Sequence, residues 1–145
     1  MPTFSLKNQI IETVAGAGLA FKEVAGAADL KAILSGRVAT PGCYVFRERN
    51  AAKPNTTGTQ FINQARTDYI GLLVVTRSVA DAKGGASADE NEDCCHALQE
   101  LLLGYVFDNY ASPLEYASGR LIMLMNGLHY WQEIYYSTRY IRSRQ

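Results

Sequence analysis

The amino-acid sequence predicts an α+β protein: a largely antiparallel β-sheet with helices packed on one face and a long helix before a C-terminal β-hairpin. The hairpin is expected because Asn126-Gly127 separates two runs of strand-forming residues, and this pair favours the positive φ angles of a type I′ turn. The long helix is expected because apolar residues recur at helical spacing over 87–105. The order of the elements also describes helices packed against a mostly antiparallel sheet.

Length and composition fit one domain. The chain has 145 residues, of which 48% are hydrophobic, and its 14 Lys and Arg balance 14 Asp and Glu. This balance argues against a protein held to nucleic acid or to a membrane surface by charge. The longest apolar runs, 69–76 and 121–125, are far shorter than the roughly 20 residues of a membrane span. No signal sequence is visible at the N-terminus, so we expect synthesis in the cytoplasm.

The first part of the chain is expected to form two helices and two strands. Thr3 or Ser5 can cap the first helix, whose apolar residues recur at i, i+4 and i+8 and which ends at Gly16. Pro41-Gly42 breaks the chain before the second strand. The expected elements are a helix up to Gly16, a strand over 19–24, a small helix over 28–34 and a strand over 43–48.

The middle of the chain is expected to hold two loops around a long central strand. The segment 49–60 is rich in Asn, Ala, Pro, Thr and Gly and has little to bury, so we expect a long mobile loop before a strand over 67–79. A second flexible segment is expected over 81–86. Its Gly84-Gly85 pair lacks the spacing of a phosphate-binding loop, so no nucleotide site is predicted.

The long helix is expected to begin with a capping box of Ser87 and Glu90, in which each side chain accepts a hydrogen bond from a free backbone N–H. Gly104 near its end and Pro113 beyond it let the chain turn back toward the hairpin. One face is apolar and consists of Cys94, Cys95, Leu98, Leu101, Leu102 and Tyr105.

The second strand of the hairpin, 128–141, alternates over an unusual length and has aromatic residues on both faces. Such a strand needs cover on both sides. The long helix can cover one face, so we expect the other face or an edge to be partly exposed in the monomer and to meet another subunit. One face holds Leu128, Tyr130, Gln132, Ile134, Tyr136, Thr138 and Tyr140; the other holds His129, Trp131, Glu133, Tyr135, Ser137, Arg139 and Ile141.

Catalytic and metal-binding patterns are weak, and we predict no enzyme activity, no cofactor and no metal. The three cysteines have no CxxC spacing and form no disulfide framework. The segment 94–96, Cys-Cys-His, lies on a helix where consecutive residues point about 100° apart and cannot all face one ion. The acidic run 89–93 suits the positive end of a helix. The alternative is an enzyme or a small-molecule-binding domain with His129 and Glu133 in a cleft on the sheet.

Arginines gather at the end of the last strand, where Arg139, Arg142 and Arg144 lie. One interpretation is solubility and protection of a strand end against pairing. The other is a charged contact with a neighbouring subunit, with Tyr136 and Tyr140 beside the arginines, because Tyr and Arg are enriched in interface cores.

Six segments, taken in order, span most of the chain. They are FKEVAGAADL at 21–30, TPGCYVF at 40–46, ALQELLLGY at 97–105, Pro113-Leu114, Gly119 and Asn126-Gly127. In order and spacing they resemble the tail-terminator, or tail-completion, proteins of long-tailed bacteriophages and prophages. None of these motifs is chemically unique, so the resemblance is one of pattern.

The resemblance implies a structural virion protein with a single domain over 1–145. Such a subunit forms a hexameric ring, caps the tail tube, ends tail elongation and presents the surface for head joining. Its implied partners are copies of itself, the tail tube protein and head-completion or connector proteins, without sequence-specific nucleic acid or membrane. It is implied to reside in the virion tail after assembly in the host cytoplasm. The loops 49–66 and 80–87 are expected to order on contact.

A head-to-tail stopper or adaptor is the alternative within the same class of assembly proteins. Under either role, the residues on and beside the strands that border the long loop, together with those at the end of the last strand, are the predicted contacts with other subunits or with the tube. They are Arg47, Arg49, Arg66, Arg77, Tyr136, Arg139, Tyr140 and Arg142.

Overall fold

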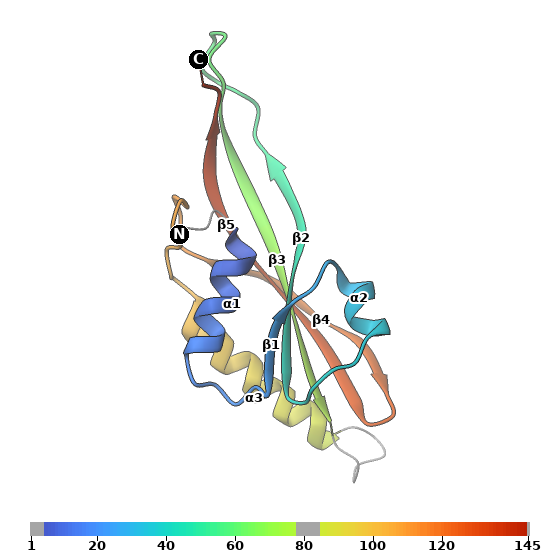
Figure 1. The fold of residues 1–145 in the computed structure, drawn as a ribbon. Helices are drawn as coiled ribbons and strands as arrows, with labels where there is room; N and C mark the ends of the chain where they lie inside the picture. The colour runs from blue at the N-terminus through green and yellow to red at the C-terminus, as the bar shows by residue number, and fades with distance from the viewer. Residues whose placement is uncertain (1–4, 78–84, 145) are drawn as a thin grey trace.

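A computed structural model describes residues 5–77 and 85–144. Within these residues, five strands form one mixed sheet in the order β1-β2-β3-β5-β4; β1 is parallel to β2, and the remaining neighbours are antiparallel. Figure 1 shows the sheet with its helices, and the α+β class is confirmed. The elements are α1 (Leu6–Gly16), β1 (Glu23–Gly26), α2 (Leu30–Ser35), β2 (Gly42–Ala52), β3 (Asn63–Arg77), α3 (Gly85–Leu102), β4 (Glu115–Met125) and β5 (Leu128–Arg142).

The main core lies between one face of the sheet and the two longer helices. Ile10 of α1 and Leu98 of α3 pack there against Leu72 of β3, and all three are fully buried. This position of α1 and α3 confirms the predicted helix cover on one face. The apolar residues of each helix recur every third or fourth position, so each helix presents one continuous stripe to the sheet.

The short helix α2 differs from the prediction because it packs against the opposite face of the sheet. Ile33 of α2 belongs to a second, smaller cluster with Tyr44, Phe46 and Tyr130. Asp29 caps α2 by accepting a hydrogen bond from the Ala32 N–H at 2.9 Å. The strand β1 that precedes α2 is an edge strand, and the chain crosses from one face to the other there (Figure 1).

The predicted long loop is shorter than expected because the strands on both sides of it are longer. Residues 49–52 continue β2 and residues 63–66 begin β3, which leaves 53–62 as the connection. The side chains of these strand ends are mostly polar, so they show no apolar periodicity from which a strand could be predicted. Their backbone groups are instead paired by the neighbouring strands, including β5 opposite Asn63 and Arg66. A register shift between Arg47 and Arg49 bends β2 at the start of this extension.

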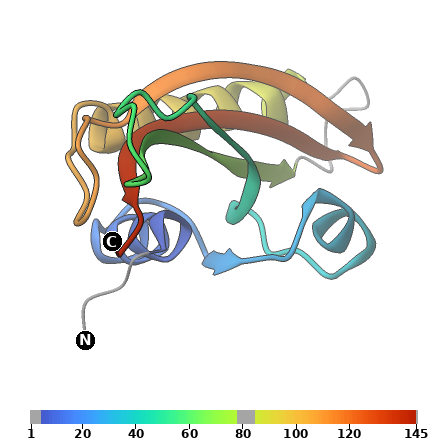
Figure 2. The same cartoon turned by 90° about the horizontal axis from the view of Figure 1, so that it is seen from above.

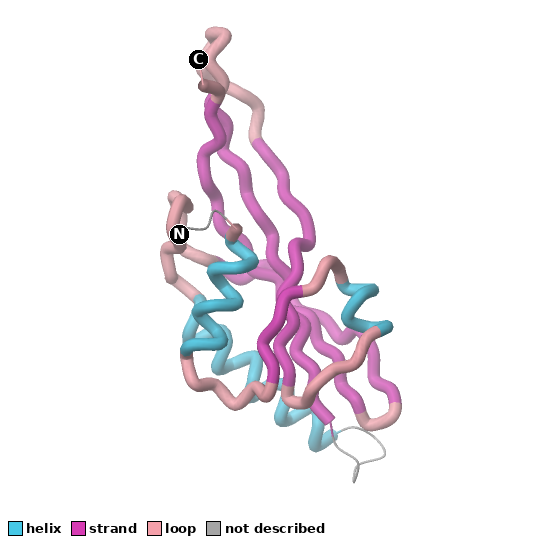
Figure 3. Tube along the Cα trace, in the orientation of Figure 1, coloured by secondary structure: helices cyan, strands magenta, loops and turns pink. Residues whose placement is uncertain are grey.

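These extended strands form an arm, defined as residues 47–69 and 136–144, which projects past the helices (Figures 1 and 3). The connection at its tip is organised by local hydrogen bonds: Thr57 Oγ1 donates to the Phe61 carbonyl at 2.6 Å, and the Asn63 N–H donates to Asn55 Oδ1 at 3.0 Å. The Ser143 N–H donates to the Ile62 carbonyl at 2.9 Å, which ties the end of the chain to the tip.

The start of α3 also differs from the prediction. The helix begins at Gly85, so Ser87 lies inside its first turn, is buried, and accepts a hydrogen bond from Thr76 Oγ1 on its backbone carbonyl at 2.6 Å. The capping box at Ser87 and Glu90 is therefore wrong. Tyr105 was expected on the apolar face but lies beyond the helix end and is exposed. The expected strand end at 78–79, most of the flexible segment 81–86 and Thr3 lie outside the described residues, and Ser5 caps α1.

The C-terminal hairpin follows the prediction closely. Asn126 and Gly127 have φ angles of 54° and 77°, as a type I′ turn requires. The first strand of the hairpin begins at Glu115, four residues before the expected start at Gly119. The second strand, β5, lies between β3 and β4 and is interior to the sheet. Seen from above, these long strands curve across the molecule (Figure 2).

Candidate subunit interface

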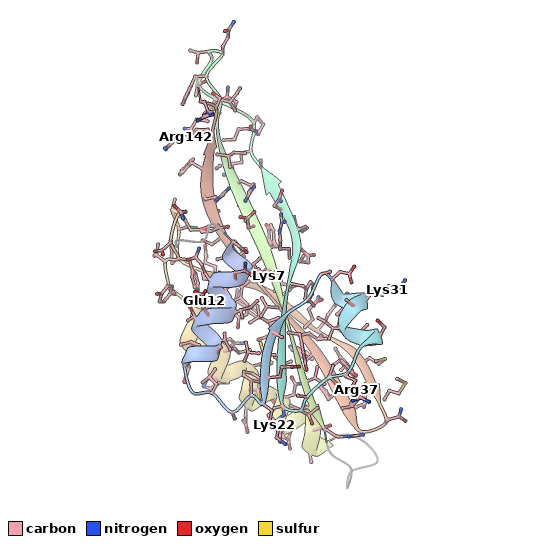
Figure 4. The ribbon with its side chains drawn as sticks, viewed as in Figure 1. Lys7, Glu12, Lys22, Lys31, Arg37 and Arg142 are labelled. Carbon is pink, nitrogen blue, oxygen red and sulfur yellow. The ribbon has the colours of Figure 1, made fainter. Side chains whose placement is uncertain are left out.

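The structure brings four of the eight predicted contact residues together. Arg47, Arg49, Arg66 and Arg139 line a hollow of about 200 Å³ between the arm and the first turn of α1. Lys7 of α1 also lines this hollow, and Figure 4 shows Lys7 at the end of α1 nearest the arm. The strands place these cations on one side because Arg66 and Arg139 are direct neighbours across β3 and β5.

Asp68 holds the base of this hollow together. Arg66 contacts it twice: Nε lies 2.9 Å from Oδ1, and Nη2 donates to Oδ2 at 3.0 Å. Tyr110 Oη also donates to Asp68, and the Arg139 guanidinium lies 5.9 Å from the centre of the Tyr110 ring. Burial and the hydrogen bond to Asp68 raise the pKa of Tyr110, so its hydroxyl keeps its proton.

The arginines of this hollow differ in whether they are paired within the chain or exposed to contact another molecule. Arg66 is engaged by a buried carboxylate of its own chain, and although burial alone would lower its pKa, the hydrogen bond to Asp68 leaves that pKa raised. Arg47 and Arg49 are exposed. Sequence inspection missed Asp68 and Tyr110; the available signal was one acidic residue directly before the apolar run 69–76.

Arginine side chains lie near aromatic rings along the arm. The guanidinium of Arg49 lies 3.8 Å from the centre of the Tyr69 ring, and that ring lies 5.5 Å from the ring of Tyr136. Further out, Arg142 lies 5.9 Å from the centre of the Tyr140 ring. Tyr140 is 52% exposed. Tyr130, Gln132 and Ile134 on the same face of β5 are buried, so the expected exposure of 128–141 is limited to its outer end, and its contact with another subunit stays a prediction.

Arg77 lies apart from the other predicted contacts. It is exposed at the last position of β3, opposite Leu128, whereas Arg66 lies in the arm near the start of the same strand. The eight predicted residues therefore do not form one continuous surface: seven lie on the arm, and Arg77 lies at the far end of the sheet. Their role in contacts stays a prediction.

A second hollow, of about 580 Å³, lies between α3 and the hairpin, which we call the α3 groove. Glu133 forms part of its floor, is only 1% exposed, and accepts hydrogen bonds from Gln99 Nε2 at 2.9 Å, Tyr116 Oη at 2.7 Å and Trp131 Nε1 at 3.0 Å. The groove is lined by Ala88, Asn91, Glu92, Asp93, Cys95, His96, Gln99, Tyr116, His129, Trp131 and Glu133.

The geometry around Glu133 argues for a structural role of this carboxylate. Its three donors are side chains of the same chain, and Gly119 leaves the space for them, because a β-carbon at Gly119 would lie 2.6 Å from Glu133 Oε2 and 3.0 Å from Trp131 Nε1. A carboxylate so fully hydrogen-bonded is poorly placed to act as a general base. His129 and Glu133 both line this groove, as the alternative hypothesis supposed, but they lie four residues apart on the extended strand β5.

His129 predicts a pH dependence of stability. Burial lowers its pKa, so the folded chain binds this proton less tightly than the unfolded chain does. The contribution of His129 to stability is therefore complete above its ordinary pKa of about 6.5 and is lost as the pH falls through the lowered value. Glu92, Asp93 and His96 of α3 and Glu133 of β5 line the same groove as His129.

The expected result is that the urea midpoint of the wild type falls between pH 7 and pH 5 by more than that of His129→Gln. His96→Gln is the matched control, because His96 is exposed and pairs with Glu100 at 3.0 Å. Equal slopes for the wild type and His129→Gln would contradict the prediction.

The described residues show neither a metal-binding cluster nor a helix that could span a membrane. Among residues 5–77 and 85–144, no group of three His, Cys, Asp or Glu side chains is placed to hold a metal ion. None of the helices in the described part of the chain is long and apolar enough to span a membrane.

Burial raises the thiol pKa of Cys43 and Cys95, which keeps both uncharged.

The fold and the arm define the class: a small α+β protein whose sheet extends into an arm rich in arginine and tyrosine. The model of the phage tail terminator protein family matches residues 3–145, and the chain belongs to this family. Its role is therefore that of a tail terminator, a structural component of the virion that interacts with other phage tail and head proteins. No curated protein matches the chain.

Proposed function

We propose that this chain caps the phage tail tube as a hexameric ring, ends tail elongation and forms the tail-side surface for head joining. Its partners are copies of itself, the tail tube protein and the head-completion proteins, and it assembles in the host cytoplasm. It acts as a structural subunit and not as an enzyme. The observation that supports this best is the arm, which extends three strands past the helices.

The physical argument rests on the composition of the arm. The solvated face of an antiparallel sheet is usually polar, whereas Tyr69, Tyr136 and Tyr140 supply large aromatic surfaces on the arm. Arg49 and Arg142 lie against two of these rings. Tyr and Arg dominate the energetics of protein interfaces because they combine large contact area with hydrogen bonding. The arm is therefore suited to protein contacts with neighbouring subunits and with the tube.

Light scattering of the full chain, alone and with tail tube protein, tests this function. The wild type is expected to reach the mass of six subunits or to bind the tube protein as a ring. Tyr136→Asp is expected to weaken assembly at least tenfold, because it places a charge on the surface of the arm. Its cost to folding is expected to be small, because the folded chain loses only the contact between the Tyr136 and Tyr69 rings.

Tyr105→Asp is the matched control, because Tyr105 is also paired with another ring, that of Phe107 at 4.5 Å, but lies off the arm. A wild type that stays monomeric and leaves the tube protein unbound would refute the proposed function. If Tyr136→Asp lowered folding stability as much as assembly, Tyr136 would instead be part of the core.

A further inference from the structure

The chain has a formal net charge of zero, but its charged residues are concentrated in two regions of opposite sign. The arm contains seven Lys and Arg but only two Asp and Glu, whereas α3 contains five Asp and Glu and neither Lys nor Arg. Figure 1 shows the tip of the arm at one end of the molecule and the first half of α3, which holds four of these acids, at the other. Opposite charges at opposite ends cannot meet within one chain, but they can meet between two copies.

The tip of the arm has an apolar centre with a basic rim. Phe61, Ile62 and Tyr140 are exposed there. The end of the chain is held beside them, because Arg142 Nε donates to Asn63 Oδ1 at 3.1 Å and Ser143 is bonded to Ile62. Arg144 follows and is exposed. Figure 4 shows Arg142 near this end of the arm.

The α3 groove has the complementary arrangement: an apolar centre with an acidic rim. Trp131 lies in the groove, and the exposed residues Glu92 and Asp93 of α3 lie on its border. On the adjoining edge strand β4, Leu121 and Leu124 are 47% and 45% exposed. Leu121 is paired with Trp131 and Leu124 with His129, so these side chains share the groove's face of the sheet.

One buried atom in the groove also points to a missing partner. His129 is 9% exposed, and its Nδ1 has no hydrogen-bond partner among the described residues. Buried polar atoms are nearly always hydrogen-bonded in folded proteins. The ring nitrogen in the wall of this groove is therefore available to a partner from another molecule.

We propose that the tip of the arm of one subunit docks into the α3 groove of the next. An arginine of the tip lies against the Trp131 indole and between the carboxylates of Glu92 and Asp93, and the apolar residues of the tip cover Leu121 and Leu124. A guanidinium suits this site because it stacks on aromatic faces and pairs with carboxylates at the same time. The contact joins two different surfaces of the same chain, which is the kind of contact that closes into a ring.

This inference rests on the proposed self-assembly and specifies its contact. A charge-swap experiment tests it in the full chain. The groove variant is Glu92→Lys with Asp93→Lys, and the tip variant is Arg142→Glu with Arg144→Glu; all four side chains are exposed, so both variants are expected to fold. Each variant alone is expected to associate at least tenfold more weakly than the wild type by light scattering, under the condition in which the wild type assembles.

An equimolar mixture of the two variants is expected to recover association. In a ring that alternates the two variants, each cationic tip meets an acidic groove and each acidic tip meets a cationic groove. The control variant Glu12→Lys with Asp108→Lys makes the same change in net charge as the groove variant, at exposed positions outside both regions, and it is expected to assemble like the wild type. Figure 4 shows Glu12 on α1, away from the tip.

Two results would overturn the docking while leaving the proposed function intact. One is wild-type-like assembly of both charge variants. The other is loss of assembly in both variants without recovery in the mixture, which would mean that the two regions do not meet each other. A wild type that fails to assemble, with or without tail tube protein, would instead remove the proposed function itself.

Discussion

Replacing Glu133 by alanine is expected to lower the free energy of unfolding by about 3 kcal/mol, the scale of losing hydrogen bonds to a buried charged group. The carboxylate is 1% exposed and accepts hydrogen bonds from Gln99, Tyr116 and Trp131. Its removal leaves these donors without their acceptor and leaves a void beside Gly119. Urea denaturation followed by circular dichroism measures the change.

Glu133→Gln separates shape from charge. It keeps the side-chain volume but offers one acceptor oxygen in place of two. The expected loss of unfolding free energy therefore lies between zero and the loss for Glu133→Ala. Glu90→Ala on the exposed side of α3 is the surface control and is expected to change stability by less than about 0.5 kcal/mol. A Glu133→Ala variant as stable as Glu90→Ala would show that the three hydrogen bonds contribute nothing net.

Gly71→Val is expected to lower the free energy of unfolding by about 3 kcal/mol, which is at the upper end of the range for overpacking in a core. Gly71 lies in the middle of β3, between β2 and β5, and faces Phe46 across the strand pair. A β-carbon at Gly71 would overlap the Phe46 ring, which is itself buried. The interior of the sheet gives that ring little room to move, so the strain falls on the backbone of the central strands.

A double-mutant cycle identifies the cause. Phe46→Ala removes the ring and creates space, so the combined loss in Gly71→Val/Phe46→Ala is expected to be smaller than the sum of the single losses by more than about 0.5 kcal/mol. Gly16→Val is the control, because a β-carbon at Gly16 meets no atom within 4 Å. Additive losses in the cycle would show that the Phe46 ring is not the obstacle.

The parts of the fold that could be predicted are those with a local physical signal. The Asn126-Gly127 turn depends on the φ preferences of two adjacent residues. The helices α1 and α3 each have an apolar stripe that can be recognised within the segment itself. The failed capping box shows the limit of such signals: Ser87 and Glu90 had suitable spacing, but the helix began at Gly85 and Ser87 was buried against Thr76.

The candidate interface was predicted in its residue types but not in its organisation. Arginine and tyrosine near the last strand were recognisable, and seven of the eight chosen residues lie on the arm. The engagement of Arg66 by Asp68, and the separation of Arg77 from the others, depend on contacts between residues far apart in the chain. The α3 groove likewise needs α3 and β4 to lie side by side, which no single segment indicates.

The α+β class, the hairpin turn and the helix faces follow from backbone preferences and apolar periodicity within short segments, so they could be predicted from the sequence. The length of the arm, the interior position of β5 and the placement of the arm and the start of α3 at opposite ends of the molecule became visible only in the folded chain. The polar strand ends have no apolar pattern and are held by backbone pairing, 49–52 with residues 66–69 of β3 and 63–66 with residues 139–142 of β5. These partners are in place only after folding.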